Sequence, residues 1–356
     1  MGRSGEIRIG IVGAGRVARE RHLPGFLALP GVRVVAVCNQ RRESSGRIAR
    51  EFDIPKVHGG WESLIDDDDV DAVVIGTWPY LHCPITLAAL DAGKHVLTQS
   101  RMAMNAREAQ RMLDRSLECP DQATMVAPSP YGLVGDAYLK RLIADGFLGV
   151  LREVHVTGLS GELADPTTPA GWRQMTKYAG FNMLDLGELH EAALRWVPPP
   201  RRVIAAASKQ IATRPDPETG DLAKVGTPDS VQVLTAYADG ARGTYRVSGV
   251  AWHEDETSIV LHGSEGTLRY DFRADEITGA HRDDPKMKPL PIPESLKGGW
   301  TAEADFVAAA RGERPVTRTT FLDGVRGMQF AEAVARSSRH QTPVDLPLKE
   351  FSNPSL

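Results

Sequence analysis

Cysteine is scarce in this chain, whose only three, Cys38, Cys83 and Cys119, stand at irregular spacing. An odd number without a CxxC pair excludes a disulfide framework and a cysteine-based metal site, so we expect free or buried thiols and no bound metal. No run approaches the roughly 18 apolar residues needed to span a bilayer. The first residues also lack the apolar core of a secretory signal. We therefore expect a cytoplasmic protein that does not enter membranes.

An excess of basic charge is also absent. The chain has 42 Lys and Arg against 46 Asp and Glu, a formal net charge of −4. Without a basic stripe, nucleic acid is not an expected partner. Hydrophobic residues make up 42% and charged residues 25%, which is ordinary for a globular protein. A length of 356 residues predicts about two domains.

Short apolar runs alternate with helical patterns as far as residue 127. We expect strands at 7–12, 32–38, near Val57, 71–76 and 94–98, and helices at 16–29 (bent or broken at Pro24-Gly25), 42–52, 61–65, 83–92 and 105–117. This alternation predicts an α/β fold with a doubly wound parallel sheet. Pro128-Ser129-Pro130 follows as a candidate hinge, so we place one domain at 1–127 and a second at 128–356.

The second half has a different pattern. Helices are expected at 133–145, 181–196, 301–311 and 321–337, a strand at 150–158, and a strand-rich region from 202 to 282. Asp239-Gly240 and Ser264–Gly266 each separate two strand-like runs, as hairpin turns do. Hairpins predict a sheet that is mostly antiparallel.

The first expected strand leads into Gly13-Ala14-Gly15-Arg16-Val17-Ala18, a GxGxxA fingerprint. The first glycine permits a tight turn, the second lets the backbone approach a pyrophosphate, and the alanine permits close helix packing. A phosphate is favoured there because the N-terminus of a helix attracts anions. Because the motif opens a β/α alternation, it predicts a dinucleotide site formed by residues 13–17.

The end of the second expected strand bears on the choice of dinucleotide. An acid there would bond the ribose 2′-hydroxyl of NAD, but this chain has Asn39, followed by Gln40-Arg41-Arg42. Arginine suits a 2′-phosphate, so Asn39 and Arg41 favour NADP over NAD. The alternative is that both arginines are solvated residues at a helix start.

More motifs follow along the chain, and together they resemble the Gfo/Idh/MocA family of glucose–fructose oxidoreductase and inositol dehydrogenase. They are Gly76–His82, Ala92–Leu97, Trp172-Arg173, Gly263–Leu268 and Pro343–Pro347, spread over nearly the whole chain. The resemblance implies a Rossmann domain and a second α/β domain with a large open sheet, often used for oligomerisation. A homodimer or homotetramer is therefore expected.

The resemblance also assigns candidate residues. For the cofactor it implies Thr77, Trp78, His82, Gln99 and Ser100, with His82 supporting the cofactor loop more than acting as a base. For the substrate we expect contacts from Arg101, Trp172, Arg173 and Asn182, whose polar groups suit a sugar-like ligand. Whether Arg173 instead pairs with an internal carboxylate is left open.

Two departures from the family pattern concern the proton. Ser100 stands where the family has a catalytic lysine, and Leu189 stands where its D-x-G-x-H motif has histidine. Asp185 of that motif remains and is the best candidate base. His190 is the second candidate, although it lies five residues on, about 140° around a helix from Asp185. The alternatives are that Asp185 only starts the helix and that His190 is only packed.

Three functions are compatible with this sequence. The first is an NAD(P)-dependent oxidoreductase that transfers hydride to or from a sugar, cyclitol or related polyol derivative. The second keeps the cofactor without net redox, as a lyase or glycosidase. The third is a non-catalytic sugar-binding protein, which the missing lysine and histidine would favour. We expect the first, because the fingerprint and Asp185 are present.

Overall fold

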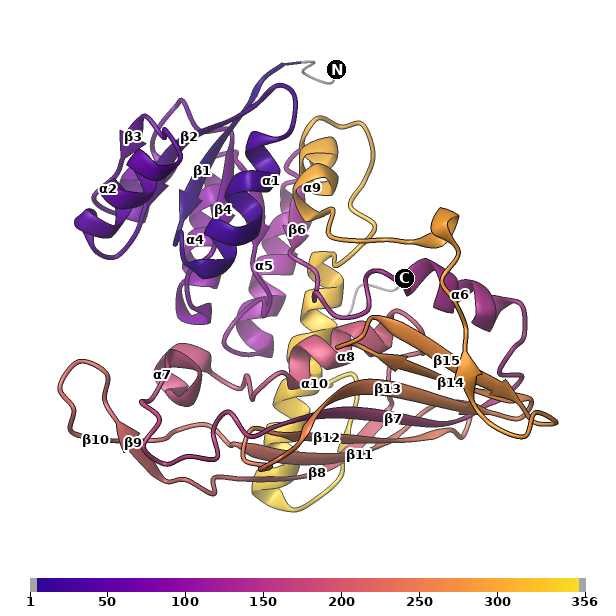
Figure 1. Cartoon of the computed structure of the whole chain (residues 1–356). Helices are drawn as coiled ribbons and strands as arrows, with labels where there is room; N and C mark the ends of the chain where they lie inside the picture. The colour runs from indigo at the N-terminus through magenta and orange to yellow at the C-terminus, as the bar shows by residue number, and fades with distance from the viewer. Residues whose placement is uncertain (1–4, 352–356) are drawn as a thin grey trace. The chain divides into compact units, whose positions relative to one another are not determined.

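The first sheet is built from short runs of buried, mostly β-branched residues, which favour strands. In the computed structural model, which describes residues 5–351, its six strands are all parallel, in the order β3-β2-β1-β4-β5-β6. The strands are β1 (Ile7–Val12), β2 (Val32–Cys38), β3 (Lys56–Val57), β4 (Ala72–Ile75), β5 (His95–Thr98) and β6 (Thr124–Val126). The predicted doubly wound parallel sheet is thereby confirmed (Figure 1).

Helices connect these strands. They are η1 (Ala18–His22), α1 (Leu23–Leu27), α2 (Arg42–Glu51), α3 (Trp61–Ile65), η2 (Pro79–Leu81), α4 (His82–Asp91) and α5 (Ala106–Glu118). The helix expected at 16–29, bent or broken at Pro24-Gly25, is present as two segments that meet at Leu23. The first, η1, is a π-turn, in which the Leu23 N–H donates to the carbonyl of Ala18. Pro24 then falls in the first turn of α1, where its missing N–H costs little.

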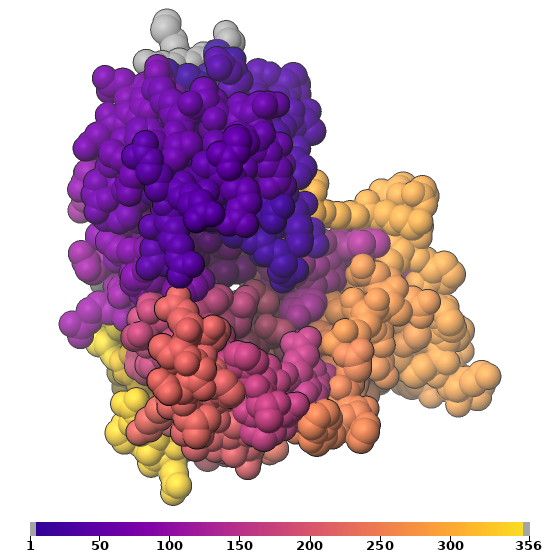
Figure 2. All heavy atoms as spheres, turned by 60° about the vertical axis from the view of Figure 1, so that its left-hand side comes forward, coloured from indigo at the N-terminus to yellow at the C-terminus, as the bar shows by residue number. Residues whose placement is uncertain are grey.

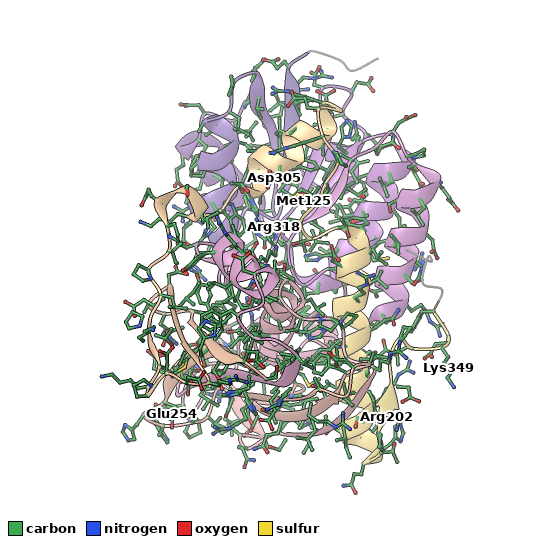
Figure 3. The ribbon with its side chains drawn as sticks, turned by 90° about the vertical axis from the view of Figure 1, so that its right-hand side faces the viewer. Met125, Arg202, Glu254, Asp305, Arg318 and Lys349 are labelled. Atoms are coloured by element: carbon green, nitrogen blue, oxygen red, sulfur yellow. The ribbon has the colours of Figure 1, made fainter. Side chains whose placement is uncertain are left out.

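The chain returns to this unit near its C-terminal end. Unit 1 comprises residues up to Pro128 together with Thr301–Arg326, which include α9 (Ala302–Ala310). Buried His22 and Glu303 are joined at 2.5 Å between Nδ1 and Oε1, and Phe26 meets Phe306 edge to face. Figure 3 labels two side chains from these distant parts of unit 1, Met125 of β6 and Asp305 of α9. This segment, expected in the second domain, lies in unit 1.

Unit 2 comprises Ser129–Trp300 and the residues from Gly327 onward. Its sheet has nine strands in the order β16-β15-β14-β13-β7-β12-β11-β8-β17, and only the β7–β12 pair is parallel. The strands are β7 (Leu151–Ser160), β8 (Arg202–Ser208), β11 (Ser230–Ala236), β12 (Arg242–Ser248), β13 (Asp255–Gly263), β14 (Gly266–Asp271), β15 (Glu276–His281), β16 (Lys288–Pro289) and β17 (Val344–Asp345). Both expected hairpins are present, as β11–β12 and β13–β14.

The remaining elements of unit 2 are mostly short. They are α6 (Asp136–Ala144), η3 (Trp172–Gln174), α7 (Thr176–Ala179), α8 (Leu186–Leu194), η4 (Glu294–Leu296) and the separate hairpin β9 (Thr213–Pro215)–β10 (Leu222–Lys224). The longer α10 (Phe321–His340) begins in unit 1 and continues into unit 2. Figure 1 shows α8 against one face of the nine-stranded sheet. The opposite face carries Ile204 and Leu234, which are register partners on β8 and β11 and are 41% and 57% exposed.

Candidate functional site

The glycine-rich turn of unit 1 has the geometry that its sequence predicts. Gly13 has φ +86°, and a Cβ atom there would lie 2.5 Å from the Thr77 nitrogen and 2.6 Å from the Gly76 carbonyl carbon. Only glycine fits, because both the backbone angle and the space exclude a side chain. At Gly15, by contrast, a Cβ would meet nothing within 4 Å. That open backbone is what a pyrophosphate approaching the turn needs.

Asn39 ties this turn to the end of β2. Its Oδ1 accepts the Ala14 N–H at 2.7 Å, and its Nδ2 donates to the Ser44 hydroxyl at 3.0 Å. Arg41, two residues further along the chain, is exposed at the start of α2. Arg16 is also exposed and pairs with Glu20 at 3.3 Å. The structure therefore places an uncharged amide and an exposed guanidinium where strand β2 ends.

His82 links the loops that follow β4 and β5. Its Nδ1 lies 3.0 Å and 3.2 Å from the carbonyl oxygens of Arg101 and Met102, and its Nε2 lies 2.9 Å from that of Thr77. The ring is buried, and burial lowers the pKa of His82. A buried imidazole that faces these carbonyl oxygens holds the two loops together.

These two loops carry further predicted residues. Trp78 is 37% exposed, whereas Thr77, Gln99 and Ser100 are half-buried. They lie at the carboxyl ends of adjacent parallel strands, the edge where open α/β sheets bind ligands. Arg101, predicted to contact substrate, is buried in unit 1.

In unit 2, Asp185 occupies the position just before α8 but accepts no capping hydrogen bond from the helix. A capping bond there is typically worth about 1 kcal/mol. The residue before it, Leu184, has φ +46°, in the left-handed region that costs a side-chain-bearing residue about 1–3 kcal/mol. Asp185 Oδ2 instead accepts the Tyr131 hydroxyl at 3.0 Å. No sequence motif pointed to Tyr131.

A second contact set from α8 fixes the segment that carries Tyr131. Arg195 donates to the carbonyl oxygens of Tyr131 and Ser129, both at 2.7 Å. It also pairs with Glu191 at 2.6 Å, and Glu191 accepts the Ser129 N–H at 3.1 Å. Asp185 at the start of α8 and Arg195 at its end therefore both bind Tyr131, the first through the hydroxyl and the second through the backbone.

The structure places His190 in the core of unit 2. The side chain is 1% exposed, its Nδ1 lies 2.8 Å from the Tyr245 hydroxyl, and its ring stacks on Phe330 with 3.6 Å between centroids. Burial lowers the pKa of His190 to about 3. His190 is therefore a buried core residue between the rings of Tyr245 and Phe330, a position that argues against direct proton transfer.

Leu189, at the family's histidine position, is also a core residue. It is 0% exposed, and its Cδ1 lies only 2.6 Å from where a Cβ at Gly158 on β7 would be. The side chain fills the space above that glycine. This position of α8 therefore serves packing in this chain.

The predicted substrate residues of unit 2 lie on one irregular segment. The Arg173 guanidinium sits 4.4 Å from the Trp172 ring centroid, a cation–π contact, and Arg173 is exposed. Asn182 is buried, and its Nδ2 donates to the Ala179 carbonyl at 2.7 Å. The structure therefore gives Asn182 a place within the loop, away from solvent.

Arg214 on β9 holds the beginning of the same segment. It is 1% exposed and donates to the carbonyl oxygens of Leu163, Asp165 (2.8 Å) and Thr168 (3.2 Å). The hairpin β9–β10, salmon in Figure 2, is at the surface of unit 2. The loop before Trp172 is thus fixed from within by a buried guanidinium that sequence reasoning did not identify.

The described residues show neither a metal centre nor a membrane-spanning helix. Residues 5–351 contain no group of three or more His, Cys, Asp and Glu side chains arranged to hold a metal ion. None of the helices in the same range has the length and apolar character needed to cross a bilayer.

Comparisons with known proteins agree with this arrangement. A model described as the oxidoreductase family with an NAD-binding Rossmann fold matches residues 7–124, and the Gfo/Idh/MocA C-terminal domain matches residues 137–269. The chain belongs to the Gfo/Idh/MocA oxidoreductase family. The resemblance inferred from the motifs is thereby confirmed, as is the family's NAD-binding fold.

Several relatives extend over almost the whole chain. Levoglucosan dehydrogenase of Pseudarthrobacter phenanthrenivorans is 26% identical, covering 96% of this chain and 98% of its own. The dTDP-3,4-didehydro-2,6-dideoxy-alpha-D-glucose 3-reductase of Streptomyces antibioticus is 29% identical, covering 94% and 98%. A solved structure of levoglucosan dehydrogenase in complex with NADH has a TM-score of 0.85 at 25% identity, covering 96% and 99%.

Proposed function

We propose that this family member is an NAD(P)-dependent oxidoreductase that transfers hydride between the nicotinamide and a sugar, cyclitol or related polyol derivative. The open backbone at Gly15 beside the closed turn at Gly13 carries the cofactor half of the proposal. The substrate half is supported by full-length relatives named for a sugar dehydrogenase and a sugar-nucleotide reductase. The polar, partly exposed Trp172-Arg173 segment suits such a ligand.

In this proposal Asp185 is the group that exchanges the proton. When bound, the cofactor supplies the hydride acceptor or donor, so the protein must supply a base or acid. A positioned acid or base is worth about 10²–10⁴-fold in rate. Ser100 cannot replace a lysine in that task, and a guanidinium such as Arg101 stays protonated and gives only electrostatic help. The half-buried Asp185 carboxylate is the remaining candidate.

For the coenzyme we propose a preference for NADP(H). The uncharged Asn39 amide does not repel a 2′-phosphate. The exposed Arg41, two residues further along the same loop, carries a positive charge that would attract it. The solved complex of the relative contains NADH, so the preference for NADP(H) rests on Asn39 and Arg41 alone.

We also propose a homodimer or homotetramer assembled through the uncovered face of the nine-stranded sheet. The neighbouring Ile204 and Leu234 side chains give that face an apolar centre. Light scattering after size exclusion would show a monomer if this is wrong. A Leu234→Lys variant should dissociate the assembly if it is right.

The test of the cofactor half is thermal stabilisation by NAD⁺, NADH, NADP⁺ and NADPH separately. A ligand at 100 times its Kd adds about 2.7 kcal/mol to the free energy of unfolding. We expect the largest shift with NADPH. No shift with any of the four would overturn the proposed function, and a larger shift with NADH would overturn only the coenzyme preference.

The substrate half is tested by a panel of polyols, including levoglucosan and myo-inositol, read by nicotinamide absorbance and by product analysis. Ser100 in place of the family lysine favours one other candidate, a reaction without net redox. In that case products would accumulate with no lasting change in nicotinamide. Binding without any product would instead indicate a sugar-binding protein.

A further inference from the structure

Within residues 5–351, the side chain that hydrogen-bonds to the Asp185 carboxylate is that of Tyr131. Its hydroxyl donates to Oδ2 at 3.0 Å. Both side chains are half-buried, so neither is enclosed in the core. The oxygen of a hydroxyl that donates its one proton keeps two lone pairs for another donor. An alcohol can supply that donor.

The Tyr131–Asp185 pair is held in place although the start of α8 is less stable for it. The Asp185 side chain does not cap the helix, and Leu184 has a positive φ. Arg195 donates a hydrogen bond to the backbone carbonyl of Tyr131. Backbone outliers of this kind concentrate at functional sites. If Asp185 only began the helix, its carboxylate would be expected to cap it.

The charges around the hydroxyl keep it protonated. Burial together with the carboxylates of Asp185 and Glu188, both at the start of α8, raises the pKa of Tyr131. Arg273, in the turn after β14, acts in the opposite direction, and the neighbouring Phe272 ring, 5.4 Å away between centroids, is uncharged. The resting state is therefore a neutral phenol bonded to a carboxylate.

We propose that Tyr131 is a catalytic residue that contacts the reacting oxygen of the substrate and transfers its proton to and from Asp185. This rests on the proposed function. In oxidation the C–H hydrogen would leave with its electron pair, as hydride, for a bound nicotinamide, and the C–O bond would become C=O. The hydroxyl proton passes to Tyr131 while the Tyr131 proton passes to Asp185. In reduction each step runs backward, so atoms and charge balance in both directions.

The pair replaces the side chains that this chain lacks. Ser100 has no titratable group, Leu189 is enclosed against Gly158, and His190 is bonded to Tyr245 inside the core. Among these candidate positions, only the tyrosine–aspartate pair has a proton to give and is not enclosed in the core.

The first test compares Tyr131→Phe, Asp185→Asn and the double variant with wild type. The control is Tyr138→Phe on α6, outside the pair. We expect kcat to fall about 10²–10⁴-fold in each single variant, with KM changed only a few-fold. The double variant should be no slower than the slower single one, since groups that act as a unit are not additive. Full activity of Tyr131→Phe would overturn the proposal.

The second test puts 3-fluorotyrosine, a more acidic phenol, at position 131. If the hydroxyl transfers the proton, the changed acidity alters kcat at neutral pH and the solvent deuterium isotope effect on kcat. An unchanged kcat with an unchanged isotope effect would leave Tyr131 a structural role only and overturn the proposal.

The fluorine atom also provides a readout without turnover. Its resonance should move when a polyol that calorimetry shows to bind, such as levoglucosan or myo-inositol, is added. An unmoved resonance with a bound polyol, or no binding by any polyol of the panel, would overturn the proposal. A protein that binds polyols at Tyr131 but oxidises none would contradict the proposed function and the proton transfer with it, and would leave Tyr131 as a contact to the ligand only.

Discussion

Two regions of this protein carry the motifs of one family with opposite outcomes. The turn at Gly13–Ala18 keeps every part of its fingerprint, and the structure gives each glycine the geometry that the fingerprint implies. At the start of α8, the D-x-G-x-H motif keeps Asp185 and Gly187 but has Leu189 in place of histidine.

The difference follows from what each motif contributes. A dinucleotide turn works through backbone N–H groups and the absence of side chains, so little can change without loss. Proton transfer needs one group of suitable acidity within reach, and different residues can supply it. A backbone motif therefore predicts its site closely, whereas a side-chain motif predicts only the region.

The largest effect is expected from Gly13→Ala, which tests the closed side of the turn. The new Cβ would collide with backbone at Thr77 and Gly76, at a φ that alanine disfavours. We expect the free energy of unfolding to fall by at least about 2 kcal/mol and nucleotide binding to be lost. Calorimetric unfolding and titration with NADPH measure both.

Gly15→Ala is the matched control, because its Cβ meets nothing within the protein. It should unfold like wild type and still bind nucleotide more weakly. Normal affinity in Gly15→Ala would contradict a pyrophosphate at this turn.

His190→Ala tests the other region. It removes the ring stacked on Phe330 and the partner of Tyr245, so we expect a loss of about 2–4 kcal/mol in unfolding free energy. His340→Ala, at the exposed end of α10, should change stability by less than about 0.5 kcal/mol. A large loss of kcat at unchanged stability would instead return His190 to the mechanism.

The same residue gives a pH dependence. Its pKa is about 3 when folded, below the value of about 6.5 when unfolded, so the unfolded chain binds the extra proton between these limits. Wild-type stability therefore falls as pH drops below about 6.5, by up to about 1.4 kcal/mol per pH unit from this group. The gap between wild type and His190→Ala should narrow from pH 7 to pH 5. A constant gap would contradict the neutral, buried state.

Features of the fold that depend on neighbouring residues could be predicted from the sequence, whereas contacts between distant residues could not. The strand runs and the glycine turn are local patterns, and the structure contains them where expected. Residues 301–326 were expected in the second domain but lie in unit 1. One contact that holds them there, His22 to Glu303, joins residues 281 positions apart in the chain. A local hydrophobic pattern cannot predict a contact between residues so far apart.

The candidate site shows the same limit. Asp185 was found through its motif, but Tyr131 lies 54 residues away from it in the chain and belongs to no motif. The helix expected from residue 181 begins only at Leu186, because Leu184 takes a positive φ that the apolar pattern does not encode. His190 was a reasonable candidate by type, and only its burial showed that it is a core residue.

Leu189→His restores the family residue and sharpens the comparison. The imidazole would replace a fully buried side chain packed against Gly158, where it would lack the partners a polar ring needs. We expect about 1–3 kcal/mol less stability and no gain in turnover. Denaturant unfolding and the polyol assay check these. A gain in kcat would show that the family mechanism is still accessible here.

The smallest effect concerns coenzyme choice in the region that kept its motif. Asn39→Asp retains the oxygen that accepts the Ala14 N–H but adds a negative charge where a 2′-phosphate would sit. We expect NADPH affinity to fall about tenfold, or about 1.4 kcal/mol, while NADH affinity holds or improves. Arg41→Ala should weaken NADPH similarly, whereas Arg42→Ala, the adjacent exposed arginine, should not. Equal losses for both coenzymes would mean that Asn39 serves only to hold the turn, and that this loop does not select between them.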